Sequence, residues 1–365
     1  MKDDKNLLKR TTFKKHDDER ISRATSIAMM SFKGGTGKTS LTAGLGLTLV
    51  RKGYDVLWID NDAQSNLTQR IGWTTGQHKS QYRVPNLLKV GDVALGDESG
   101  INAVLQVPLN INYSFFYKER GLGDYGKGKL GIIGGSNFAS IEASSLNDKY
   151  KKDRTAFEYP SVPAFYNSAI GVYKQYFDYI LFDTAPSMEG NLLNILTVLA
   201  ADEVVTPVDG LEAANGISNM ISFVQGHTMN SLSEYGVKKP APNMTFAMVK
   251  YQRDSKTKID GLEEVIEGGI LGENEVFRLL KTVLGNFVCD KGVQERQALR
   301  QTLSGFSAND YSKLSIEIIQ KLQEKRPNIH DIWNTEKRSL LEAGLQEIEL
   351  KNLVKRPILK GCNFK

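Results

Sequence analysis

Cysteines and long apolar runs are both scarce in this sequence. Its 365 residues include two cysteines, Cys289 and Cys362, and neither has a cysteine or histidine partner at the spacing of a zinc site. We therefore expect no disulfide framework and a reducing compartment, the cytoplasm. No run approaches 18 apolar residues, which argues against a membrane-spanning helix, and residues 1–23 lack the apolar stretch of a secretory signal.

Charge of one sign is not in strong excess either. The formal net charge is +5 and the pI is about 8.9, which is compatible with a polyanionic partner but modest for this length. The hydrophobic content of 40% suffices for a large core, and 33 glycines fit a soluble α/β protein with many tight loops. The length allows one large domain or two ordinary ones.

A strand–turn–helix–strand unit follows a polar N-terminal arm, residues 1–24, that we expect to be flexible. The pattern predicts a buried strand, a glycine-rich turn, a helix and a second strand at Thr25–Phe32, Lys33–Ser40, Leu41–Lys52 and Tyr54–Ile59. Such βαβ units build parallel sheets. Further predicted strands are Lys129–Gly134, Phe177–Phe182, Glu203–Pro207 and Thr245–Lys250, and Leu314–Leu322 has helical periodicity.

The glycine-rich turn has the features of a phosphate-binding loop, although Phe32 occupies the place of the first glycine in the strict motif. Its backbone N–H groups can surround a phosphate chain, and the following helix directs its positive end to the same place. Lys38 is expected to reach the β- and γ-phosphates, and the Thr39 hydroxyl is expected to ligate Mg²⁺. The residues predicted to bind nucleotide here are Lys33, Gly34, Gly35, Thr36, Gly37, Lys38, Thr39 and Ser40.

The additional lysine at the start of the loop, Lys33, gives the pattern K-G-G-x-G-K-[ST]. This pattern resembles the deviant Walker A signature of the ParA/MinD ATPases. The resemblance implies a P-loop α/β fold, a mostly parallel twisted sheet flanked by helices on both faces. It also implies that two chains close over two ATP molecules, with Lys33 reaching the partner's ATP. A second ammonium stabilises charge during phosphoryl transfer as an arginine finger does.

Two carboxylate segments resemble those of the ParA-type DNA-partition ATPases. Residues 60–68, DNDAQSNLT, are similar to the family's D-x-D-P-Q-x-N-x-T stretch, with Ala63 in place of proline. Strand alternation predicts Asp60 at the strand tip, beside the phosphate loop of the neighbouring strand. The resemblance implies that Asp60 belongs to the surroundings of Mg²⁺ and that Asp62 positions or polarises the attacking water. Residues 179–187, YILFDTAPS, resemble a Walker B strand, in which Asp183 holds Mg²⁺. The predicted catalytic residues are thus Lys33, Lys38 and Asp62, and the predicted metal ligands are Thr39, Asp60 and Asp183.

A fourth segment, residues 201–208, resembles the family's A-D-E-V-x-x-P-V stretch and implies that Pro207 and Val208 lie near the adenine. The ATPase domain is accordingly expected at 25–326, with an enlarged segment at 71–162 and a helical extension at 327–365. Where relatives often show a proline–arginine pair, this chain has Leu284 to Phe287.

The resemblance implies a partition ATPase that forms a homodimer with ATP, binds DNA non-specifically and responds to a ParB-like centromere-binding partner. Such a protein is expected in the cytoplasm, associated with the nucleoid. DNA binding of this kind needs only clustered basic side chains. The candidates are Lys250, Arg253, Lys256, Lys258, Arg296, Arg300, Lys321, Lys325 and Arg326.

Other functions of the same loop remain open as alternatives. A MinD-like ATPase that positions itself on membranes needs a basic amphipathic terminal helix; residues 350–360 have the composition, but Pro357 interrupts them. An iron–sulfur reductase of the same superfamily needs more cysteines at the dimer face than this chain has. Related tyrosine kinases carry a tyrosine-rich tail, but the last tyrosine here is Tyr311, so this class is disfavoured too. A nucleotide-gated scaffold without turnover is disfavoured by Asp62.

Overall fold

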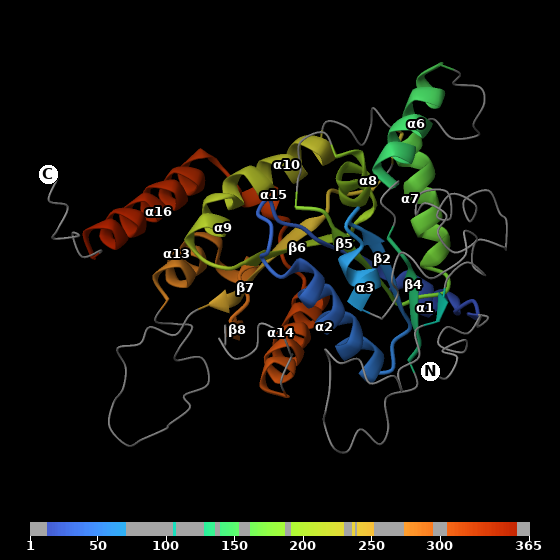
Figure 1. The fold of residues 1–365 in the computed structure, drawn as a ribbon, viewed down its shortest axis with the longest axis horizontal. Helices are drawn as coiled ribbons and strands as arrows, with labels where there is room; N and C mark the ends of the chain where they lie inside the picture. Colours follow the sequence, from blue (N-terminus) through green and yellow to red (C-terminus); the bar gives the residue numbers. More distant parts are fainter. Residues whose placement is uncertain are drawn as a thin grey trace, which may run out of the picture.

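A parallel sheet forms the centre of the molecule (Figure 1). The computed structural model describes residues 13–70, 105–106, 128–135, 139–152, 161–186, 191–229, 236–237, 239–251, 274–294 and 305–355. Within these ranges the sheet has eight strands in the order β3-β4-β2-β5-β1-β6-β7-β8, and β3 alone runs antiparallel to its neighbour. The strands are β1 (Thr25–Met29), β2 (Val56–Asn61), β3 (Leu105–Gln106), β4 (Leu130–Ile133), β5 (Tyr179–Thr184), β6 (Glu203–Val208), β7 (Asn243–Tyr251) and β8 (Val293–Gln294).

Helices cover both faces of this sheet, as predicted (Figure 1). One face carries α2 (Lys38–Arg51) and α14 (Gly305–Gln323), which pack on each other. The other face carries α7 (Val162–Tyr173), α8 (Leu192–Ala200), α9 (Leu211–Asn215), α10 (Ile217–Met229), α13 (Glu275–Leu284), α15 (Ile329–Ile332) and α16 (Thr335–Lys355). The remaining described helices are α1 (Asp18–Ser22), α3 (Asn66–Arg70), α6 (Ala139–Lys152) and the 3-10 turn η2 (Gly285–Phe287).

Side chains of each strand alternate between two cores, because successive residues of a strand point to opposite faces. On β2, Trp58 packs in the core under α2, whereas Leu57 and Ile59 pack in the core under α7 and α8. Both cores consist of fully buried apolar side chains, so the central strands are apolar on both faces, as in parallel sheets generally. No described helix has the length and apolar content needed to cross a membrane.

The predicted strands are present, with boundaries shifted by one to three residues. Helix α2 begins at Lys38 rather than Leu41, because Gly37 supplies the left-handed N-cap conformation at φ 90°. Helices α7, α8, α10 and α13 were not predicted. The enlarged segment 71–162 falls largely outside the described residues. The described part of the extension packs on the domain: Leu341, Leu345 and Ile348 of α16 join the core, and α16 contacts α13 and α9.

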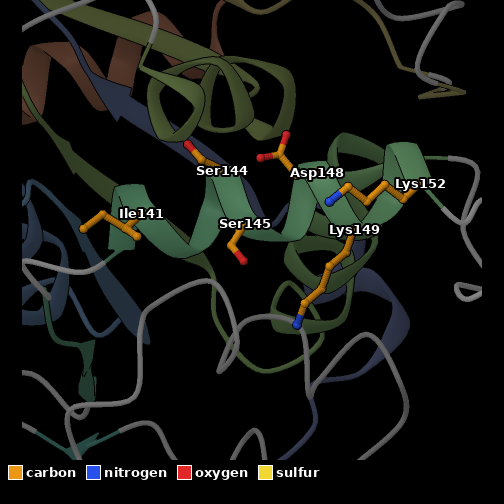
Figure 2. Close-up of a pocket in the computed structure, with 6 residues that line it drawn as sticks. All are labelled: Ile141, Ser144, Ser145, Asp148, Lys149 and Lys152. Carbon is orange, nitrogen blue, oxygen red and sulfur yellow. The ribbon is translucent and has the colours of Figure 1, made fainter.

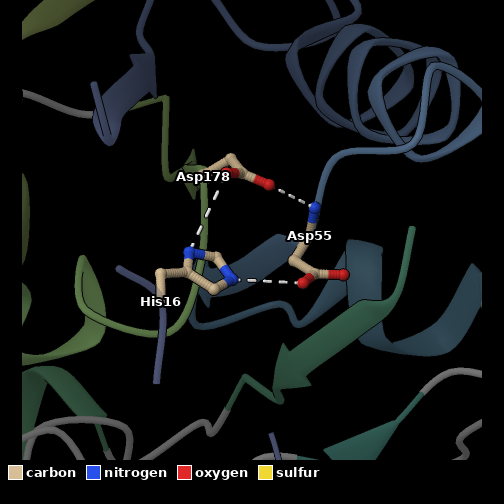
Figure 3. Close-up of side chains that lie close together, drawn as sticks. All are labelled: His16, Asp55 and Asp178. Carbon is tan, nitrogen blue, oxygen red and sulfur yellow. Dashed lines mark hydrogen bonds and ion pairs between the residues drawn. The ribbon is translucent and has the colours of Figure 1, made fainter. Parts of the chain in front are cut away.

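The described part of the N-terminal arm is folded against the domain, which differs from the flexible arm expected for residues 1–24. Phe13 is buried with its ring 4.6 Å from that of Phe177. His16 Nε2 lies 3.2 Å from Asp55 and His16 Nδ1 lies 3.8 Å from Asp178 (Figure 3). Arg20 pairs with the same two carboxylates. Because Arg20 already supplies a cation to both carboxylates, this cluster fastens the arm to the domain.

We predict opposite effects for two glycine-to-alanine changes in helices. An alanine at Gly46 of α2 would place its Cβ 2.2 Å from Nε1 of the buried Trp58, whereas the same change at Gly171 of α7 meets nothing within 4 Å. Gly171→Ala should raise the free energy of unfolding by up to about 1 kcal/mol through helix propensity. Gly46→Ala should lower it by about 1–2 kcal/mol, because overpacking outweighs that gain. Urea denaturation of both variants provides the measurement, and a stabilised Gly46→Ala would contradict the packing described.

Candidate functional site

The loop between β1 and α2 has the backbone conformation that a phosphate-binding loop requires. Gly35 and Gly37 have φ values of 75° and 90°, which side chains other than glycine rarely adopt. Gly37 caps α2 without a side-chain hydrogen bond, so the first N–H groups of this helix remain directed at the loop. The loop and the positive end of α2 therefore form an anion-binding concavity.

Lys38 lies inside this loop. Its side chain is almost fully buried, with the residue 6% exposed, and its Nζ donates to the carbonyl oxygen of Lys33 at 3.3 Å. The hydroxyls of Thr36 and Ser31 donate to the same carbonyl at 3.5 and 3.4 Å. An ammonium held there is placed to neutralise phosphate oxygens that enter the loop.

Lys33 points the opposite way, toward the surface between β6 and α9. Its Nζ lies 2.7 Å from Glu212 and 3.5 Å from Asp209. The hydrogen bond that Lys33 donates to Glu212 is the main cause that raises the pKa of Lys33, and burial partly opposes it. The side chain remains 37% exposed. The two lysines of this segment thus point in different directions: Lys38 faces the loop, and Lys33 faces the surface.

Two carboxylates meet at the carboxyl ends of adjacent strands. Asp60 of β2 and Asp183 of β5 are register partners, and Met29 at the end of β1 is the partner of Asp183 on its other side. We expected Asp60 on the strand next to the phosphate loop, and this was wrong. Strand β5 is inserted between β2 and β1, so Asp183 is the carboxylate that borders the loop.

Asp183 is fully buried, and neither of its oxygens has a hydrogen bond of standard geometry within the described residues. Burial, followed by repulsion from Asp60, raises its pKa to about 8, although the Thr39 hydroxyl and Lys38 lie near enough to oppose the shift. A buried carboxylate of this kind needs a cation or a proton. Asp183 and the Thr39 hydroxyl therefore fit a Mg²⁺ site, as hard cations prefer such oxygen ligands.

Asp60 is also fully buried but is well bonded. Its Oδ2 accepts from the backbone N–H and the hydroxyl of Thr68 at 2.8 and 2.6 Å, and its Oδ1 accepts from the N–H of Asp62 at 3.3 Å. Burial raises its pKa to about 6, and the bonds from Thr68 limit the shift. These bonds occupy both oxygens of Asp60 within the protein, and the bond from Asp62 supports the turn that carries this second aspartate.

Asp62 is held in one orientation at the start of that turn. Its Oδ1 accepts from the N–H of Gln64 at 2.9 Å, and its Oδ2 accepts from Nδ2 of Asn66 at 3.2 Å. The residue is 6% exposed. A fixed carboxylate at this edge is suited to accept a hydrogen bond from a water molecule, which keeps the predicted role of Asp62 as a hypothesis.

The other predicted site residues lie as follows. Gly34 and Ser40 belong to the loop and the first turn of α2, and Pro207 and Val208 end β6 directly before the Asp209 that contacts Lys33. The loop residues and the residues predicted to lie near the adenine thus share one edge of the sheet. Lys250 lies on β7, and Arg253, Lys256, Lys258, Arg296 and Arg300 fall outside the described residues.

Two predicted DNA contacts are used inside the fold instead. The Arg326 side chain is 7% exposed, pairs with the buried Glu203 and donates to Thr245 at 2.8 Å. Lys321 is 6% exposed, and its Nζ donates to the carbonyl of Asn286 at 2.9 Å. Sequence spacing could not distinguish these buried cations from surface ones. Lys325, between them, is exposed.

A separate hollow lies over α6 (Figure 2). Its lining side chains come from this one helix: Ile141, Ser144, Ser145, Asp148, Lys149 and Lys152. None of them was predicted as a site residue, and among the described residues no second element contributes a polar group to the hollow.

Several residues of the site were quoted in the motifs without a role. Thr68 and Asn66 hold Asp60 and Asp62, and both occur in the N-x-T part of the family stretch, which could have indicated them. Asp209 and Glu212, which bind Lys33, follow the predicted adenine segment. A carboxylate after that segment carries no recognisable signal in a single sequence.

Comparisons with known proteins identify the family of this chain. The profile of the CobQ/CobB/MinD/ParA nucleotide binding domain matches residues 27–329. A ParA family protein of Chlamydia muridarum is 22% identical over 304 residues, covering 82% of this chain and 99% of the relative. The sporulation initiation inhibitor protein Soj of Bacillus subtilis is 25% identical over 221 residues, covering 58% and 70%.

Among solved structures, a cobyrinic acid a,c-diamide synthase from Mycobacterium smegmatis with bound ADP and magnesium is similar to this chain. Its TM-score is 0.54 at 15% identity, covering 84% of this chain and 98% of that one, which shows a common fold. The family profile spans the phosphate loop, both carboxylate strands and the adenine segment. This chain belongs to the CobQ/CobB/MinD/ParA family of nucleotide-binding proteins, and its relatives include ParA-type proteins.

Proposed function

We propose that this chain is an ATPase of the DNA-partition type that dimerises with ATP. The observation that carries the proposal is the opposite orientation of the two loop lysines. Lys38 is buried within its own loop, whereas Lys33 is exposed at the rim, where a second chain can meet it. One loop therefore offers one ammonium to its own nucleotide and one to a partner's.

The chemistry proposed for the site divides among its residues. The loop N–H groups and Lys38 bind the phosphates, and Thr39 and Asp183 hold Mg²⁺, which neutralises charge on the phosphate oxygens. Asp62 orients the attacking water through its fixed carboxylate. Lys33 of the second chain stabilises the charge that develops in the transition state. To do so it must leave Asp209 and Glu212, so its ion pairs would be exchanged on dimerisation.

The proposed role of the dimer is to bind DNA non-specifically until a ParB-like centromere-binding partner stimulates hydrolysis. This places the protein in the cytoplasm at the nucleoid. The support is the similarity to ParA-type proteins together with the basic net charge. The basic residues still proposed as DNA contacts are Lys250, Arg253, Lys256, Lys258, Arg296, Arg300 and Lys325.

Replacing Lys33 with alanine should separate nucleotide binding from assembly. We expect Lys33→Ala to bind ATP within a few-fold of the unchanged protein, because Lys38 and the loop remain, but to lose dimerisation and about 10³-fold in turnover. Light scattering after gel filtration and phosphate release measure the two losses. Lys52→Ala, which removes an exposed lysine at the far end of α2, is the control. Unchanged self-association and turnover in Lys33→Ala would exclude the shared-lysine mechanism.

DNA binding should depend on the nucleotide. In co-sedimentation with plasmid DNA, we expect binding with Mg²⁺-ATP, little with ADP or without nucleotide, and a marked loss between low and high salt, because phosphate contacts release counterions. Binding that ignores the nucleotide would contradict the partition proposal. Sedimentation with anionic liposomes instead of DNA would favour a membrane-positioning ATPase.

Asp183→Asn should stabilise the protein without Mg²⁺ and nucleotide. Burial keeps Asp183 protonated up to about pH 8 in the folded chain, whereas the unfolded chain ionises it above 3.8. Between these values ionisation favours the unfolded state increasingly as the pH rises. The advantage of the asparagine variant in free energy of unfolding should therefore grow by up to about 4 kcal/mol from about pH 5 to pH 8, because each pH unit contributes about 1.4 kcal/mol.

Urea denaturation in a chelator at several pH values measures this difference. With Mg²⁺-ATP the order should reverse, because ligand binding stabilises only the form that retains the carboxylate. An identical pH dependence in the two proteins would show that Asp183 is not the unpaired acid described here.

A further inference from the structure

A buried polar network lies on the face of β2 opposite to the side chain of Asp60. Asn61 stands between Asp60 and Asp62, and strand alternation turns its side chain toward α7 and α8. It is 1% exposed, and its Nδ2 donates to Oη of Tyr166 at 3.0 Å and to Oγ1 of Thr197 at 2.7 Å. Leu57 and Ile59 on the same face of β2 are apolar, whereas Asn61 at the end of the strand is polar and hydrogen-bonded to α7 and α8.

Helix α8 makes a second contact of the same kind to the other carboxylate strand. Asn194, one turn before Thr197, donates from Nδ2 to the carbonyl of Ala185 at 3.2 Å. Ala185 follows Asp183 by two residues. Thr197 and Asn194 are both fully buried and share one face of α8, being three residues apart. One helix therefore holds the end of β2 and the end of β5.

Stability alone does not account for this network. Apolar side chains of similar shape would pack against α8 without needing partners, and such replacements are often neutral. Asn61 Oδ1 has no hydrogen bond within the described residues, so the network carries an unmet acceptor. A buried polar cluster that is retained despite this cost specifies position rather than adding stability.

We propose that Asn61 and Thr197 are positioning residues for ATP hydrolysis. Their hydrogen bond holds the end of β2 to α8, and Asn194 of the same helix holds the end of β5. Asp62 and Asp183 therefore keep a fixed separation, so the water and the metal stay aligned on one phosphate. Alignment of this kind matters because a displacement of about 1 Å can cost about a hundredfold in rate. The inference rests on the hydrolysis proposed above, and it assigns no contact with nucleotide to either residue.

The test compares three threonine variants of the full-length chain. Thr197→Val keeps the shape and removes the hydroxyl that Asn61 binds, and Thr197→Ser restores a hydroxyl. Thr228→Val is the matched control, because Thr228 is a fully buried threonine that donates to the carbonyl four residues earlier in α10, as Thr197 does in α8. Among the described residues, the hydroxyl of Thr228 has hydrogen bonds only to carbonyls of its own helix.

We expect Thr197→Val to lower kcat at least tenfold while KM for ATP and the affinity for ADP change less than twofold. Thr197→Ser should recover most of kcat, and Thr228→Val should leave it unchanged. Asn61→Leu should lower kcat at least as much as Thr197→Val, because it also removes the hydrogen bond to Tyr166. The double variant should be no slower than Asn61→Leu alone, because the contact between Asn61 and Thr197 is already lost there. The proposal would be overturned by an unchanged kcat in Thr197→Val or by equal losses of kcat and nucleotide affinity. It would also be overturned if the loss of kcat in the double variant equalled the product of the losses in the two single variants.

Hydrogen exchange separates this inference from the proposed function. In the unchanged protein, Mg²⁺ with a non-hydrolysable ATP analogue should protect both the peptide with Asp60 to Gln64 and the peptide with Asp183 to Ala185. In Thr197→Val the protection should persist in the second peptide and fall in the first. A protein without turnover would refute the ATPase proposal, and equal protection of both peptides in Thr197→Val would refute the role of α8.

Discussion

The site depends on one arrangement: two buried carboxylates at the ends of neighbouring parallel strands. The register of β2 against β5 fixes Asp60 beside Asp183, and β1, on the other side of β5, delivers the phosphate loop to the same edge. Burial raises the pKa of both acids, so this pair of carboxyl groups favours a bound proton or a nearby cation. The fold thus holds a charge imbalance that a metal ion would relieve.

The two acids differ in how far the protein satisfies them. Thr68 gives Asp60 two hydrogen bonds, whereas the oxygens of Asp183 have none of standard geometry in the described part of the chain. The protein therefore fixes one carboxylate as a support and leaves the other available to a ligand. This asymmetry gives the neighbouring strands different roles, although both end in aspartate.

The sequence was sufficient to predict the elements that carry glycine or charge at a strand end. Asp60 and Asp183 were placed at the ends of the correct strands and Lys33 to Gly37 in the loop, because a strand that ends in a loop of glycines or in aspartate is a local pattern. Lys38 to Ser40 were assigned to the same loop but form the first turn of α2. The order of the strands was not local: β5 follows β2 by more than a hundred residues and still inserts between β2 and β1. For the same reason the burial of Lys321 and Arg326 could not be read from their spacing, since Glu203 and Asn286 approach them only in the folded chain.

The chain also separates what must stay fixed from what must exchange partners. Asp60, Asp62, Asn61 and Lys38 are buried and hydrogen-bonded, so their positions are determined within one chain. Lys33 is bound by Glu212, a carboxylate that is 79% exposed, and an ion pair this exposed contributes little stability and can be exchanged readily. If turnover requires a second chain, the exchangeable residue has to be the one at the surface. The rigid set then makes hydrolysis efficient, and the exposed lysine makes it conditional on assembly.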